Sequence, residues 1–119
     1  EFSTTREIVE EVCEFIWKTL RPIYMPKPTK EDWQTISREY KELWNFSNCI
    51  GALDGKHINI QSPINYGSAY FNYKGNNSIV LLALVDAHYK FITIDVGSYG
   101  RNSDRHVFAK SALGKVLER

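Results

Sequence analysis

The sequence has little cysteine, no long apolar run and almost no net charge, and each shortage excludes a class of protein. Two cysteines, Cys13 and Cys49, are too few for a disulfide framework, and their apolar neighbours predict small buried side chains in a reducing compartment. No apolar run approaches the roughly 20 residues of a membrane span, so we expect neither a span nor a signal peptide. The net charge of +1 gives no field that would by itself attract nucleic acid.

Two amphipathic helices are predicted before residue 48. Residues 4–7 have the spacing of a capping box, and apolar residues recur behind them at helical spacing up to residues 21–22, where a proline-rich linker follows. A second helix is expected to begin at Thr29, with Asp32 three residues on. It carries an apolar stripe that we expect to enter the core, formed by Trp33, Ile36, Tyr40, Leu43 and Trp44.

From residue 48 the periodicity changes from that of helices to that of strands. The predicted strands cover residues 49–61, 79–85 and 91–96, and the second of them is apolar on both faces, as a central strand is. Residues 62–77 and 97–102 are predicted to be loops, and residues 86–90 a turn. Ser103 and Asp104 then cap one final helix.

The most informative stretch is the run of residues 49–58, in which an apolar strand delivers an aspartate, a glycine, a lysine and a histidine. Alternation places Asp54 on the same face as Ile50, Ala52 and Ile58, so that it interrupts an apolar face. A carboxylate is costly there unless a cation meets it. The run alone leaves two interpretations open: a metal-binding or catalytic aspartate, or a strand-end aspartate that turns the chain before glycine.

Three more motifs follow this run in a fixed order. They are residues 70–75 (YFNYKG), residues 84–87 (LVDA), and residues 97–100 (GSYG) with the pairs 103–104 and 107–108 behind them. With these four motifs, the segment 48–108 resembles the DDE endonuclease domain of Harbinger-type transposases and of the nucleases domesticated from them. Upstream, the family resemblance extends to the part that precedes that domain, through residues 28–29 (PT), Trp33 and residues 44–46 (WNF). The resemblance covers nearly the whole chain, but only part of the family's full length.

The resemblance implies an α/β fold in which residues 48–119 form the amino-terminal part of an RNase H-like domain. That part has a three-stranded antiparallel sheet plus one helix, and residues 1–47 precede it as a helical lead-in. The implied function is a DNA nuclease that uses Mg²⁺ or Mn²⁺ and acts in the nucleus, with a Myb/SANT-like protein as a further partner. Asp54 matches the family's first catalytic carboxylate, and the other two would follow residue 119, so these residues alone are expected to be inactive.

Other acidic residues are weighed as additional metal ligands. The family carries an aspartate at the place of Asp104, which makes it a candidate ligand, although a helix N-cap is the simpler interpretation of an aspartate there. Asp86 is interpreted as a turn residue and Asp95 as a solvated strand residue. Arg101 and Arg105 stand where the family usually has serine.

Three cations are candidates for contacts with nucleic acid: Lys56, Lys74 and Arg101. Lys74 lies in a loop with glycine and amide side chains, which suits phosphate contacts, whereas Lys56 also fits an exposed strand residue. His57 should lie on the strand face opposite Asp54. His57 is more simply interpreted as a hydrogen-bonded packing residue than as a ligand, unless a β-bulge at Gly55 turns its ring to the other face.

Two further expectations concern an alternative function and the assembly of the chain. The alternative function to a nuclease is that of a domesticated, non-catalytic remnant that binds DNA or protein. A partial sheet should also leave an edge of residues 79–85 unpaired, so the chain is expected to form homo-oligomers.

Overall fold

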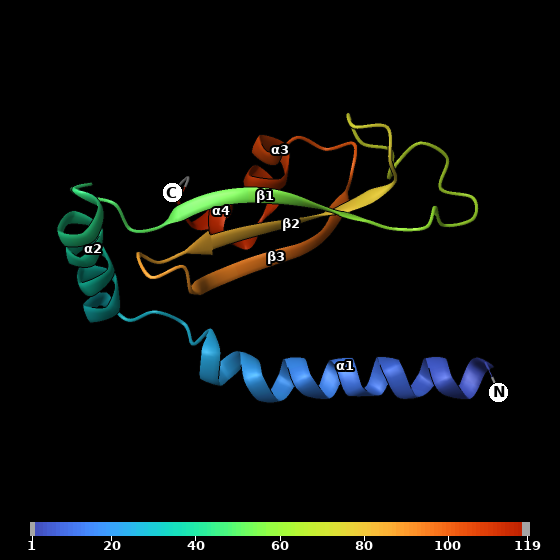
Figure 1. Ribbon diagram of the computed structural model, residues 1–119, viewed down its shortest axis with the longest axis horizontal. Coiled ribbons are helices and arrows are strands. Elements are labelled where there is room, and N and C mark those ends of the chain that lie inside the picture. Colours follow the sequence, from blue (N-terminus) through green and yellow to red (C-terminus); the bar gives the residue numbers. More distant parts are fainter. Residues whose placement is uncertain (1, 118–119) are drawn as a thin grey trace.

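The computed structural model describes residues 2–117, which form a three-stranded sheet and four helices (Figure 1). In chain order the elements are α1 (Phe2–Tyr24), α2 (Lys30–Trp44), β1 (Ala52–Asn59), β2 (Ser78–Val85), β3 (Phe91–Tyr99), α3 (Asp104–Lys110) and α4 (Ala112–Leu117). Both α3 and α4 lie on one side of the sheet, and α1 runs alongside it beyond β3 (Figure 1). The predicted α/β fold with an antiparallel three-stranded sheet is confirmed. None of the helices in the described part is long and apolar enough to cross a membrane.

The strand β2 lies in the middle of the sheet, as predicted, and pairs antiparallel with β1 and β3. Every second residue of β2 is buried, and Val80 and Leu82 meet Val107 of α3 in the core. The expectation of an unpaired edge on residues 79–85 is therefore wrong. Within the described residues the free edges belong to β1 and β3, because β2 uses both of its edges for pairing.

The strand β3 is longer than predicted, because it absorbs residues that were expected to form a loop. Its register with β2 shifts between Val80 and Leu81, opposite Gly97, which adopts a φ of 113°. Glycine reaches this left-handed region without the steric penalty of a Cβ. The strand can therefore bulge there and resume pairing as far as Tyr99, which lies opposite Ile79.

The single final helix of the prediction is two short helices. Ser111 separates them: its hydroxyl donates to the carbonyl oxygen of Phe108 at 2.7 Å and accepts from the Gly114 N–H at 3.0 Å. These bonds end α3 and begin α4. At the other end of α3, Ser103 is the N-cap and accepts from the His106 N–H. Asp104 is the first residue inside the helix, so its assignment as an N-cap is wrong.

The helix α1 begins before the predicted capping box and ends after the predicted stop. Pro22 lies inside its last turn, because the chain resumes helical bonding immediately, with the Met25 N–H donating to the Arg21 carbonyl at 2.8 Å. The apolar stripe of α1 is exposed, with Phe15 at 69% and Ile23 at 65% of their full exposure. Cys13 is exposed on this helix and Cys49 is half-buried, so the expectation that both cysteines are buried is wrong.

The helix α2 begins as predicted, with Thr29 as its N-cap and Asp32 completing a capping box. Hydrogen bonds from the Thr29 backbone N–H and hydroxyl lower the pKa of Asp32. Two side chains tie α2 to the sheet region: the Tyr40 hydroxyl donates to the Val85 carbonyl at 2.8 Å, and the Trp44 Nε1–H donates to Ala87 at 2.9 Å. Tyr40 is buried, but the rest of the stripe is not: Trp33 and Ile36 are half-buried, and Leu43 and Trp44 are exposed.

Candidate functional site

Asp54 lies on the edge strand β1, where it pairs with Ala83 across the ladder to β2. Its Oδ1 accepts a hydrogen bond from the Gly55 N–H at 2.9 Å. Its strand face carries apolar residues as predicted, but that face is open to solvent, because Ala52, Asp54 and Ile58 are all exposed. The opposite face of β1, with Gly55 and His57, is the half-buried one. The carboxylate of Asp54 is therefore accessible to solvent and to ligands, without the desolvation cost that the pattern suggested.

Asp104 is brought directly against Gly55, although the two residues are far apart in the sequence. A Cβ built on Gly55 would lie 3.0 Å from the Asp104 Oδ2 and closer still to its Oδ1, a separation that real Cβ atoms do not show. Only glycine at this position leaves room for the carboxylate. Asp54 and Asp104 are both among the residues that line one hollow of about 190 Å³, so the two acidic residues of the predicted site border the same space.

A second hollow of about 330 Å³ adjoins this one. His57 and Tyr73 line it together with Gly55, the loop residues 100–103, which include Arg101, and Asp104 at the start of α3. Of the three predicted cations, Arg101 lines the hollow and Lys74 lies beside it, with its Nζ 5.5 Å from the ring centroid of Tyr73. Lys56 lines neither hollow and shares the exposed face of β1 with Asp54. The structure thus separates Lys56 from the other two cations.

His57 is held in place by a buried hydrogen-bond network. Its Nδ1 lies 2.8 Å from the hydroxyl of Ser78, which is fully buried, and Asn72 donates to the same hydroxyl at 2.8 Å. The ring also meets Tyr73 edge to face, with centroids 5.6 Å apart. No bulge occurs at Gly55, since the β1–β2 register is continuous. The predicted hydrogen bonding of His57 is confirmed, whereas sequence reasoning did not identify its partners, Ser78 and Tyr73.

The acids of the described residues fit part of a metal site. Within residues 2–117, no three His, Cys, Asp or Glu side chains gather closely enough to hold an ion. Mg²⁺, however, keeps several waters and commonly takes only one or two carboxylates. Asp54 and Asp104 match that number. Asp86 does not join them: its Oδ1 accepts from the His88 and Lys90 N–H groups, which confirms it as a turn residue.

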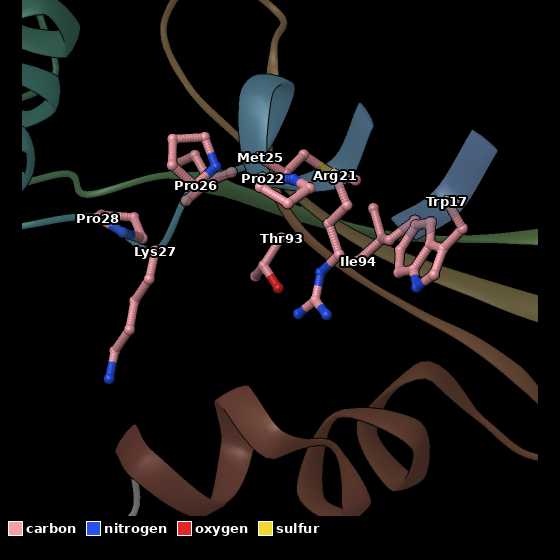
Figure 2. A pocket seen from close by; sticks show the side chains of 10 residues that line it. Trp17, Arg21, Pro22, Met25, Pro26, Lys27, Pro28, Thr93 and Ile94 are labelled. Carbon is pink, nitrogen blue, oxygen red and sulfur yellow. The ribbon is translucent and has the colours of Figure 1, made fainter. Parts of the chain in front are cut away.

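A larger hollow than these two lies elsewhere, between α1 and β3. It has a volume of about 470 Å³ and is lined by residues between positions 17 and 28 and by residues 92–94 of β3. Figure 2 shows the guanidinium of Arg21 extended beside Thr93 and Ile94, and this guanidinium also lies 5.3 Å from the ring centroid of Trp17. None of the predicted site residues lines this hollow, so its size does not identify it as the catalytic site.

Comparison with known proteins identifies the class to which this site belongs. The model of the family described as DDE superfamily endonuclease matches residues 53–119, which is more than half of the chain. The chain therefore belongs to this family of nucleases. The match begins beside Asp54 and includes Gly55 and Asp104. No curated protein and no solved structure matches the chain.

Proposed function

We propose that this chain is part of a Harbinger-type, transposase-derived nuclease that cleaves DNA phosphodiester bonds with Mg²⁺ or Mn²⁺ in the nucleus. The observation that carries the proposal is the packing of Asp104 on Gly55, the neighbour of Asp54, so that two acidic residues line one hollow. Membership of the DDE endonuclease family supports nuclease chemistry. The four sequence motifs support the Harbinger type, and the nucleus follows from that type.

In this proposal Asp54 and Asp104 hold one hydrated divalent cation. Such a cation, when bound, stabilises developing charge on phosphate oxygens and lowers the pKa of an attacking water. Gly55 keeps space for the Asp104 carboxylate, and the backbone N–H of Gly55 orients Asp54. Arg101 and Lys74 lie on the side of the adjoining hollow, where they would neutralise phosphates of the DNA backbone. Lys56 lines neither hollow, and we assign it a weaker contact with a DNA phosphate farther from the metal site.

We further propose that the chain associates with other proteins. The exposed apolar face of α1, with Phe15 and Ile23, and the free edges of β1 and β3 are surfaces that soluble proteins normally cover. A second copy of the chain and a Myb/SANT-like protein are the proposed partners. The segment before residue 48 would then be a helical lead-in used for contacts, and residues 48–119 would be the catalytic part.

A plasmid-nicking assay tests this function. These 119 residues should not nick supercoiled DNA with Mn²⁺, because the family resemblance places only the first of the three catalytic carboxylates, Asp54, among them. Joined to a following strand with its aspartate and a helix with its glutamate, the chain should nick DNA, and Asp54→Asn should abolish that activity. A joined protein that binds DNA without nicking it in either form would instead support the non-catalytic remnant. Nicking that survives Asp54→Asn would contradict the assignment of this carboxylate.

A further inference from the structure

The orientation of the Asn72 amide is fixed by its backbone neighbours. Its Oδ1 accepts from two main-chain N–H groups, those of Lys74 at 2.9 Å and Asn76 at 3.2 Å. A backbone N–H can only donate, so the atom facing it must be the amide oxygen. The amide nitrogen of Asn72 then necessarily faces Ser78 and donates to its hydroxyl oxygen. The usual ambiguity of an asparagine side chain does not arise here.

The hydroxyl of Ser78 transmits this orientation to His57. Ser78 is fully buried, and its Oγ has two partners, Asn72 and the His57 Nδ1. A serine hydroxyl carries one hydrogen and two lone pairs. Because Asn72 donates to it, the acceptor that remains for the serine hydrogen among its partners in residues 2–117 is the His57 Nδ1. A neutral imidazole whose Nδ1 accepts carries its own hydrogen on Nε2.

We propose that this relay makes His57 a fixed N–H donor to the 330 Å³ hollow, where its Nε2–H and Arg101 bind a phosphate oxygen of the DNA backbone. His57 lines that hollow while its Nδ1 is occupied by Ser78, so Nε2 is the ring nitrogen left for a ligand. A phosphodiester presents only acceptors, which matches a neutral N–H and a guanidinium. The donor works without a charge on the ring. The phosphate part of the inference rests on the proposed function, but the relay does not.

The inference links two sequence motifs that are otherwise unrelated. Residues 70–75 supply Asn72, whose carbonyl holds the turn and whose amide nitrogen starts the relay. The run 49–58 supplies His57 at the other end, and Ser78 at the start of β2 joins them. The turn is thereby a positioning element for the site, in addition to any phosphate contact by Lys74.

Nitrogen NMR of the ¹⁵N-labelled chain tests the relay directly. The measurement is made at about pH 8.5, two units above the ordinary pKa of an imidazole. The His57 Nδ1 should be unprotonated and its Nε2 protonated. The variant Asn72→Asp is nearly isosteric and should reverse this. The new carboxylate is ionised, because two backbone N–H groups still donate to it. It therefore accepts the hydrogen of the Ser78 hydroxyl. The Ser78 oxygen must then accept a hydrogen bond from the His57 Nδ1, which carries the proton. A protonated Nδ1 in the unaltered chain would overturn the inference, and so would an unprotonated one in folded Asn72→Asp.

Ser78→Ala keeps the relay testable if Asn72→Asp does not fold. Without the hydroxyl, the His57 Nδ1 has no fixed partner, and the two ring nitrogens should give signals averaged between the tautomers. Retention of a single Nε2–H tautomer in Ser78→Ala would show that something else orients the ring and would overturn the relay.

Fluorescence anisotropy with a short labelled DNA duplex in Mg²⁺ tests the phosphate site. Asn76→Asp is the matched control, because it adds the same charge at the same turn with an exposed side chain outside the relay. Asn72→Asp should bind roughly tenfold more weakly than this control, the loss expected for one hydrogen bond to a charged oxygen. Equal affinities would overturn the phosphate site while leaving the nuclease proposal to the plasmid assay. No binding by the unaltered chain would overturn the phosphate site as well, whereas the tautomer would stand.

Discussion

Gly55→Ala should displace the Asp104 carboxylate while leaving the fold intact. The added Cβ would lie 2.5 Å from the Asp104 Cγ and 3.0 Å from its Oδ2, so the side chain must rotate away. Asp104 is exposed, so its carboxylate can move into solvent at a rotamer cost of about 0.5–1.5 kcal/mol. Replacing a strand glycine by alanine also lowers the conformational entropy of the unfolded chain, which stabilises the folded state by a comparable amount, about 0.5–1 kcal/mol. The net change in unfolding free energy should therefore stay within about 1 kcal/mol.

The effect on metal binding should be much larger than the effect on stability. Moving one of two carboxylates off the hollow should weaken Mn²⁺ binding roughly tenfold or more, the range seen when a residue that supports a ligand is altered. Urea unfolding and Mn²⁺ titration of the same preparations measure both quantities. Gly55→Ala with unchanged Mn²⁺ affinity would refute the reasoning, because Asp104 would then not need its place on Gly55.

Gly100→Ala is the matched control, since it makes the same chemical change at another tight contact. Its Cβ would meet the hydroxyl of Ser78 and two backbone carbonyl oxygens, those of Tyr70 and Ser78. Backbone atoms in a buried turn cannot rotate away, so overpacking should cost about 1–3 kcal/mol or more. A stability loss as small as that of Gly55→Ala would contradict this account of the turn.

Three further predictions concern stability. Ser103→Ala should lose about 1 kcal/mol as the cap of α3, whereas Asp104→Asn should lose less, and urea unfolding that ranked them the other way would restore Asp104 as the cap. Leu82→Ala should lose about 2–5 kcal/mol, because this side chain is 3% exposed in the core, and a loss below 1 kcal/mol would contradict its packing. Hydrogen bonds from Thr29 lower the pKa of the Asp32 carboxyl in the folded chain. The ionised carboxylate therefore stabilises α2 at pH values above the unfolded pKa of Asp32, and this stabilisation is lost as the pH falls through the folded pKa. In Thr29→Ala these bonds are absent, so carboxyl NMR should give a higher pKa for Asp32 than in the unaltered chain.

Those parts of the fold that depend on local interactions could be predicted from the sequence. The α2 cap at Thr29 and the turn at Asp86 are made by side chains that bond to their own neighbourhood, and spacing alone reveals them. The central position of β2 follows from its apolar residues on both faces. Continuation of α1 through Pro22 was missed, because one lost N–H does not end a helix that recovers its bonding in the next turn.

The site could be predicted only in part, because its geometry depends on distant packing. Periodicity identified the two faces of β1 but not which one α3 and α4 would cover, and so Asp54 was placed on the wrong kind of surface. The contact between Gly55 and Asp104 depends on where the chain returns after β3, which no local pattern encodes. The separation of Lys56 from Arg101 has the same origin. The order of the family motifs was the one signal that pointed to both acids.

Paramagnetic broadening by Mn²⁺ in the ¹⁵N spectrum of the unaltered chain tests the central claim most directly. If Asp54 and Asp104 form one metal site, the amide signals of Asp54, Gly55 and Asp104 should broaden first, at the lowest Mn²⁺ concentrations. Asp54→Asn and Asp104→Asn should each shift this selective broadening to higher concentration. Broadening that begins instead at the Asp86 turn or along α1, and that is unchanged in both variants, would contradict the shared carboxylate site.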